Sequence, residues 1–139
     1  MNKFDQLTFE EIETVLKIGK DFPLFKIITI DERIELLEKA YFTSKSKGEY
    51  IFTQGEDAEF FFLVYSGKVI SYSKDKTIKT IDSMLKSGSF CGYKDLLQGK
   101  KFSNSTKTWE DGKIIVFKES VITPLLETHD NLKEILLKS

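Results

Sequence analysis

Apolar side chains near the N-terminal end of the chain recur at the spacing of helices that bury one face. Two of these stretches also carry a helix-start signal, because Thr8 precedes Glu11, and Thr29 precedes Glu32, by three residues. At this spacing a threonine and a glutamate satisfy each other's backbone donors at the first turn. The pattern therefore predicts two helices, at residues 9–18 and 30–40.

The C-terminal end has the same helical spacing. It predicts helices at residues 120–127 and 130–137, with Asp130 as the cap of the second one. We expect four apolar side chains of the last helix to stay partly exposed in a monomer: Leu132, Ile135, Leu136 and Leu137. An apolar face of this kind predicts a homodimer or a partner protein that docks on the C-terminal helix.

The middle of the chain changes to short runs of β-branched and aromatic residues, separated by Gly, Asp, Asn and Ser. Eight strands are expected, at residues 41–44, 50–53, 60–65, 69–72, 78–81, 89–91, 106–109 and 114–117. Residues 92–97 interrupt this pattern, and Leu96 and Leu97 would anchor a short helical turn there on the core. Short, regularly spaced strands favour an antiparallel sandwich, roll or jelly roll over a parallel sheet with crossover helices.

Length and composition indicate one domain. The chain has 139 residues, 40% of them hydrophobic, which suits a single core spanning residues 1–139. Within it we expect N-terminal helices at 1–40, a β region at 41–118 and C-terminal helices at 119–139. The apolar stretches are too short to cross a bilayer, and the N-terminus lacks the order of a signal peptide, so a cytoplasmic protein without membrane contact is expected.

The few reactive side chains argue against several enzyme classes. The single cysteine, Cys91, cannot form an internal disulfide, and we expect a buried, inert thiol. The single histidine, His129, lies outside the β region and is expected to flank a helix at the surface. One His and one Cys do not supply a transition-metal site or a hydrolase triad, so no metal, no catalytic residue and no enzyme activity are expected.

Three segments of the β region carry a family likeness: residues 48–57, 62–69 and 88–97, with glycines at 48, 55, 67, 88 and 92. Together with the order of the elements, they resemble the cyclic nucleotide-binding domain of the catabolite-activator and kinase-regulatory-subunit family. The resemblance covers nearly the whole chain from about Phe22. It implies a mainly β fold, an eight-stranded antiparallel β-roll (double-stranded β-helix, jelly-roll-like) with N-terminal helices, a short internal helix and two C-terminal helices.

The resemblance also implies a ligand site beside Gly92. In the family, the amides of the short helix after this glycine face the phosphate of a cyclic nucleotide, a Glu just after it takes the ribose hydroxyl, and an Arg further on pairs with the phosphate. Here Tyr93 stands where the Glu is expected, and residues 102–108, which align with the Arg-containing stretch, hold no Arg. Substitute contacts to a cyclic nucleotide or another small anion are expected from a wider set of residues: Gly92, Tyr93, Leu96, Leu97, Lys101, Ser103, Ser105 and Thr106.

Two functions are compatible with these residues. The first is a regulatory or sensory module in signal transduction, which binds a small anion or has a degenerate pocket with weak or no binding of cAMP and cGMP. The second is a protein-interaction or dimerisation domain with no small-molecule ligand. A degenerate pocket requires Tyr93 or Phe102 to fill the roll, whereas a sensor requires an open polar cavity. The net charge of −1 and the absence of a following helix-turn-helix region in this sequence argue against DNA binding.

Overall fold

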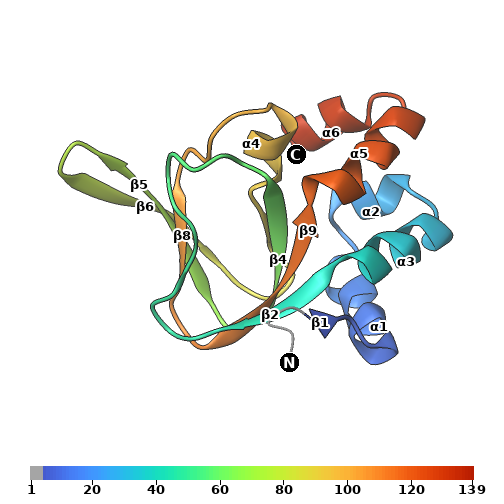
Figure 1. Cartoon of the computed structure of the whole chain (residues 1–139), viewed down its shortest axis with the longest axis horizontal. Helices are drawn as coiled ribbons and strands as arrows, with labels where there is room; N and C mark the ends of the chain where they lie inside the picture. The colour runs from blue at the N-terminus through green and yellow to red at the C-terminus, as the bar shows by residue number, and fades with distance from the viewer. Residues whose placement is uncertain (1–4) are drawn as a thin grey trace.

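The computed structural model describes residues 5–139, which form an antiparallel β-roll with helices against one side (Figure 1). All eight expected strands are present, and the predicted fold is confirmed. They are β2 (Tyr41–Lys45), β3 (Tyr50–Phe52), β4 (Phe60–Ser66), β5 (Val69–Asp75), β6 (Ile78–Leu85), β7 (Phe90–Cys91), β8 (Ser105–Thr108) and β9 (Gly112–Lys118). A two-residue strand, β1 (Asp5–Gln6), was not predicted and pairs with β2.

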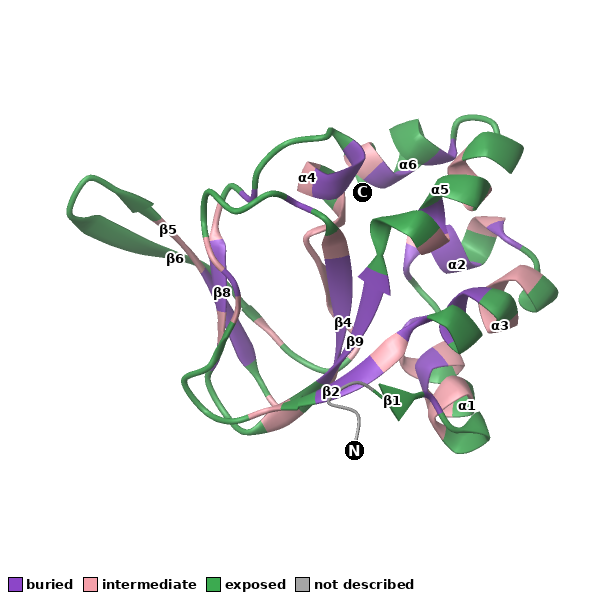
Figure 2. Ribbon diagram, in the orientation of Figure 1, coloured by how far each residue is buried: buried purple, intermediate pink, exposed green. Residues whose placement is uncertain are grey.

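The strands form two sheets that face each other across the roll. One sheet has the order β1-β2-β9-β4-β7 and the other the order β3-β8-β5-β6. Residues 61–64 of β4 and 114–117 of β9 are buried throughout, because the roll covers one face of these strands and the helices cover the other. Figure 2 shows this burial along β4 and β9, in contrast to the exposed β5–β6 hairpin that projects from the roll.

The N-terminal helices begin where the capping signals placed them. Helix α1 (Phe9–Ile18) and helix α3 (Ile30–Lys39) both have complete capping boxes, formed by Thr8 with Glu11 and by Thr29 with Glu32. A five-residue helix, α2 (Pro23–Ile27), was not predicted, because one and a half turns show no measurable periodicity. It begins at a proline and is held to the core by the buried side chains of Leu24 and Phe25.

The remaining helices are α4 (Tyr93–Leu97), α5 (Glu119–Thr128) and α6 (Leu132–Lys138). The predicted cap at Asp130 is wrong. Helix α6 starts two residues later, after Asn131 in a left-handed conformation, and no side chain caps it. Strands β5 and β6 also extend further than predicted, because they continue to pair through polar residues that the apolar pattern does not mark.

Helix α6 packs against α2 and α4, and this packing buries more of it than the sequence suggested. Leu132 and Leu136 are fully buried within the monomer, so the expectation that they stay partly exposed is wrong. The side chain of Ile135 is exposed, and that of Leu137 is partly buried. Helix α2, which the sequence did not predict, supplies part of the surface that covers the two leucines.

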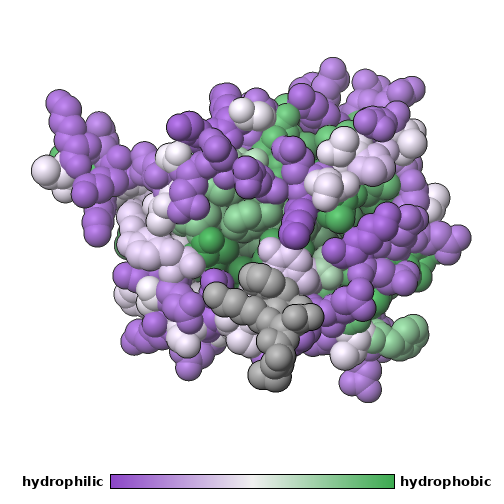
Figure 3. All heavy atoms as spheres, in the orientation of Figure 1, coloured by the Kyte–Doolittle hydropathy of each residue, from purple (hydrophilic) through white to green (hydrophobic). Residues whose placement is uncertain are grey.

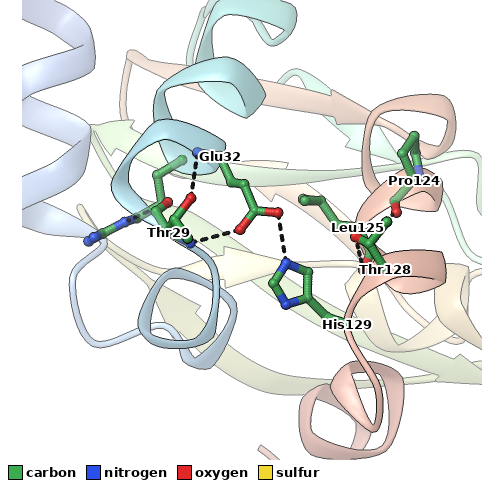
Figure 4. A network of polar contacts seen from close by, with 7 residues as sticks. Thr29, Glu32, Pro124, Leu125, Thr128 and His129 are labelled. Carbon is green, nitrogen blue, oxygen red and sulfur yellow. Dashed lines mark hydrogen bonds and ion pairs between the residues drawn. The ribbon is translucent and has the colours of Figure 1, made fainter.

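A polar network joins the N-terminal helices to the C-terminal ones (Figure 4). His129, the residue that ends α5, contacts Glu32 of α3 through its Nε2, 2.7 Å from Oε2. The other carboxylate oxygen of Glu32 accepts the Thr29 N–H at 2.9 Å. The expected helix-flanking position of His129 is therefore confirmed, but its side chain is a partly buried link between helices rather than a free surface group.

The buried face of α6 can be tested by comparing two neighbouring residues. We expect Leu136→Ala to lower the free energy of unfolding by about 2–5 kcal/mol, because it leaves a cavity between α6, α2 and α4. Ile135→Ala, at an exposed position of the same helix, should change it by less than about 0.5 kcal/mol. Urea unfolding of the three proteins measures both effects, and equal losses would contradict the packing described.

The link between Glu32 and His129 predicts a pH-dependent stability. The Thr29 N–H, and next the His129 side chain, lower the pKa of Glu32 below its ordinary value of 4.5. A carboxyl with a lowered pKa stabilises the fold above its unfolded-state pKa and loses this contribution as the pH falls through the folded-state value. Wild type should therefore exceed Glu32→Gln in unfolding free energy near neutral pH, and the difference should begin to shrink near pH 4.5 and disappear below the lowered folded-state pKa.

The matched control for this measurement is Glu38→Gln, an exposed position of α3 outside the network. We expect it to follow the wild-type stability curve when unfolding is measured across the same pH series. A Glu32→Gln protein that stays as far below wild type at low pH as at neutral pH would disprove the electrostatic contribution of this link.

Candidate functional site

Gly92 forms the corner at which β7 turns into α4. Its φ of 91° is a left-handed conformation that side chains other than glycine rarely adopt. A Cβ atom at this position would lie 3.2 Å from the ring of Phe52 and 3.3 Å from the ring of Phe102. Both the backbone and the close approach of two rings therefore require glycine here.

The interior of the roll next to Gly92 is filled by aromatic rings. Phe52 of β3 and Phe102 stack face to face, with ring centroids 3.6 Å apart and planes 3° apart. Each ring is 2% exposed, and Phe60 of β4 packs edge-on against both of them. We call these three residues, Phe52, Phe60 and Phe102, the aromatic plug. Phe102 opens the stretch in which the family carries its arginine, so a neutral ring occupies the region expected to hold a phosphate.

The polar groups of the following loop already have partners inside the chain. The Oδ2 of Asp95, on α4, accepts both the N–H and the hydroxyl of Ser103 at 3.0 Å. The Ser105 hydroxyl accepts the Gln54 N–H at 2.8 Å. Lys101 is exposed, and its backbone pairs with Asp57. A carboxylate thus stands where an anion was expected, and the predicted donors of Ser103 are used by it.

Thr106 is the predicted residue that does face the inside of the roll. Its side chain is fully buried on β8, and its register partners are Phe52 on β3 and Ser71 on β5. Its Oγ1 has no hydrogen-bond partner among the described residues. The neutral hydroxyls of Thr106 and its neighbour Ser71 cannot compensate the loss of hydration of a phosphate, because burying a charge requires charged or multiple hydrogen-bonding partners.

Tyr93 lies outside the interior of the roll. As the first residue of α4 it points toward α2 and α6, where its ring meets that of Phe22 edge-on at 5.0 Å. Its hydroxyl lies 3.0 Å from Oγ of Ser139, directly after α6. The expectation that Tyr93 fills the roll is therefore wrong, because Phe102 fills it and Tyr93 joins α4 to α6; the expected ligand contact of Tyr93 stays a prediction.

Leu96 and Leu97 are buried and anchor α4 on the core, as the sequence suggested. Beside them, burial raises the pKa of the Cys91 thiol to about 12, and the nearby carboxylate of Asp95 adds to this effect. The thiol therefore stays protonated at neutral pH. A protonated, largely buried thiol is a poor nucleophile, which agrees with the structural role expected for Cys91.

The structure brings only part of the predicted site together. Gly92 and Thr106 both border the plug, whereas Tyr93, Ser103 and Ser105 are bonded to other partners and Lys101 is exposed. Sequence analysis missed the roles of Phe52 and Asp95. Phe52 could be found only by knowing which strand faces Gly92, and Asp95 only by knowing how the loop after α4 folds back on it.

The part of the chain that the structure describes has neither a metal-ligand cluster nor a membrane-spanning helix. No group of three or more His, Cys, Asp or Glu side chains in residues 5–139 is arranged to hold a metal ion. None of the helices in this part of the chain is both long and apolar enough to cross a membrane.

Comparison with known proteins gives a match to a family and to many solved structures. A model of the cyclic nucleotide-binding domain matches residues 42–129. No curated protein matches this sequence. The three solved structures described next are each less than 20% identical to this chain, so their similarity shows the fold alone.

The sensor domain of the transcriptional regulator DNR from Pseudomonas aeruginosa superimposes with a TM-score of 0.79 at 19% identity, over 94% of this chain and 88% of that one. The regulatory domain of Toxoplasma gondii PKA with cAMP superimposes with a TM-score of 0.80 at 14% identity, over 93% of this chain and 49% of that one. The regulatory subunit of a cAMP-independent protein kinase A from Trypanosoma cruzi, bound to guanosine, superimposes with a TM-score of 0.73 at 18% identity, over 85% of this chain and 42% of that one. This chain thus spans about half of the two kinase regulatory chains.

Because the family model matches more than half of the residues of this chain, the chain belongs to the cyclic nucleotide-binding domain family.

Proposed function

We propose that this chain is a non-catalytic regulatory module whose ligand site is closed by its own side chains, so that it works without a cyclic nucleotide. Homologues in this family are regulatory and sensory modules. The observation that carries the proposal is the stack of Phe52 on Phe102 against Gly92. A sensor for a small anion would need an open polar cavity at this place.

The energetics of the missing contacts point in the same direction. A hydrogen bond to a charged partner contributes about 1.5–3 kcal/mol, and each 1.4 kcal/mol is about tenfold in affinity. The absence of the family's Glu and Arg therefore weakens binding by about a hundredfold or more. The Asp95 carboxylate at the loop adds repulsion of a phosphate, and a ligand would also have to displace two stacked rings.

The plug is connected through α4 to the C-terminal helix α6. It packs on Gly92, which starts α4, and α4 lies against α6 with Tyr93 and Ser139 in contact. In this proposal the plug holds α4, and through it the closing helices, in one arrangement that a partner protein recognises. A structurally similar kinase subunit is described as cAMP-independent, and this chain would be another family member without that dependence.

Calorimetric titration tests the closed site. We expect no binding of cAMP or cGMP to the wild type at micromolar concentrations, because the plug and the missing charged contacts together remove the affinity. The double variant Tyr93→Glu, Phe102→Arg places both family residues in the chain and removes one of the three rings of the plug. Binding of cAMP should appear in this variant, provided that circular dichroism shows an intact fold.

Phe102→Ala serves as a second variant in case the double variant fails to fold. It removes the ring without adding a charge, and we expect it to show weak binding of cAMP that the wild type lacks, because the roll is then open beside Gly92. Micromolar binding of a cyclic nucleotide by the wild type would contradict the proposal that the site is closed.

The connection between the plug and the helices can be tested by amide hydrogen exchange. Phe102→Ala should raise the exchange rates of α4 and α6 more than those of β2 and β9, because α4 loses its support at Gly92. Ile114→Ala, a buried position of β9, is the matched control for general destabilisation. Equal patterns of exchange in the two variants would mean that the plug does not control the helices.

A further inference from the structure

The outer face of the sheet β3-β8-β5-β6 carries exposed apolar side chains that no part of the described chain covers. Alternation along the strands places Ile70 and Tyr72 of β5 on this face, because Val69 and Ser71 point into the roll. Ile70 is buried but does not belong to the main core, which agrees with this side of the sheet. The cross-strand register then adds Met84 and Ile81 from β6.

Two further aromatic residues extend the face. Tyr50 of β3 joins it through its hydroxyl, which lies 2.6 Å from the hydroxyl of Tyr72. Trp109 follows β8 directly and continues its alternation, two residues after Lys107. Ile81, Trp109, Met84 and Tyr50 are 67%, 51%, 50% and 42% exposed, so four of the exposed large apolar side chains of residues 5–139 gather on one face. Contiguous apolar surface of this kind marks interaction sites.

Lysines border this apolar surface. The ammonium of Lys107 lies 5.3 Å from the ring centre of Tyr50, and that of Lys79 lies 5.5 Å from the ring centre of Tyr72. Lys74 borders a groove of about 650 Å³ beside the two tyrosines. The hydrogen bond from Tyr72 lowers the pKa of Tyr50, and Lys107, Lys79 and Lys74 lower it further, which reflects the positive potential on this face. We call these residues and the apolar ones the lysine-rimmed face.

The acidic side chains of the same strands do not neutralise this rim. Asp82 accepts a hydrogen bond from Ser73, whose position in the alternation puts it on the other side of the sheet. Glu110, next to Trp109, forms an ion pair with Lys68 at 3.4 Å. The projecting hairpin formed by β5 and β6 is mostly hydrophilic in Figure 3. With the exposed apolar residues and the lysines near the tyrosines, the face combines an apolar centre with a basic border.

We propose that the lysine-rimmed face is a docking site for a protein segment that carries acidic side chains around apolar ones. Carboxylates of the partner meet Lys74, Lys79 and Lys107, and its apolar side chains cover Ile81, Met84 and Trp109. This site is on the opposite side of the sheet from the aromatic plug, and its occupation does not depend on whether the plug excludes nucleotides.

Other occupants fit the face less well. Binding of single-stranded nucleic acid uses several rings for base stacking, but a lysine ammonium already lies over each tyrosine, which leaves Trp109 for stacking on this face, and the chain has a net charge of −1. A second copy joined through the same face would place lysines opposite lysines, because a two-fold interface brings identical patches together. An acidic, apolar polypeptide satisfies both the charge and the apolar area.

A peptide library tests the proposal without a known partner. Phage-displayed random peptides are selected on the wild type, after subtraction on the double variant Ile81→Ser, Met84→Ser. We expect the enriched sequences to combine Asp and Glu with apolar residues. Enrichment of basic sequences, or no enrichment over the subtracted pool, would overturn the proposal.

The best peptide is then synthesised with a fluorophore, and its affinity is measured by anisotropy. Lys79→Glu and Lys107→Glu should each weaken binding by about tenfold or more, because each reverses a charge at the rim, and Ile81→Ser should weaken it by a similar factor. Ile78→Ser is the matched control, since Ile78 is 68% exposed on the same strand but on the other side of the sheet. Equal loss with Ile78→Ser, or tighter binding of labelled oligothymidylate than of the peptide, would contradict the assignment.

Discussion

The stack of Phe52 on Phe102 is the contact on which the interpretation of this domain depends. It closes the roll where the family's resemblance implies a phosphate, and it does so with two side chains from segments that lie far apart in the chain. Gly92 allows the stack, because any Cβ there would press on both rings. The family resemblance implies that this glycine lets the backbone approach a ligand. In this chain, Gly92 lets the backbone approach the rings of Phe52 and Phe102.

Replacing a ligand by side chains changes what such a domain can do. A ligand shifts a conformational equilibrium only through a difference in its affinity for the two states. In the proposed function the rings are covalently attached and always present, so the helix that follows Gly92 is held independently of any metabolite. Tyr93 extends this hold to the C-terminal helix through its contact with Ser139. The domain then resembles a regulator fixed in one state, with specificity residing in its surfaces.

Those surfaces differ in chemistry on the two sides of the molecule. The helical side is closed by the burial of Leu132 and Leu136 and by the link from His129 to Glu32. The outer face of the four-stranded sheet instead leaves Ile81 and Met84 uncovered beside lysines. The exposed apolar surface of this face is larger than that of the C-terminal helix, where Ile135 is exposed but Leu132 and Leu136 are buried.

Sequence by itself determined the order of the elements other than β1 and α2, the two capping boxes, the turn glycines and the loss of the family's Glu and Arg, because these are local signals read within a few residues. It also identified Phe102 as one of two residues able to fill the roll. Only the tertiary structure decided between Phe102 and Tyr93, paired Asp95 with Ser103, and buried Leu132 and Leu136. These outcomes depend on which side chains meet across strands and helices that are distant in the chain, and no local pattern encodes such meetings.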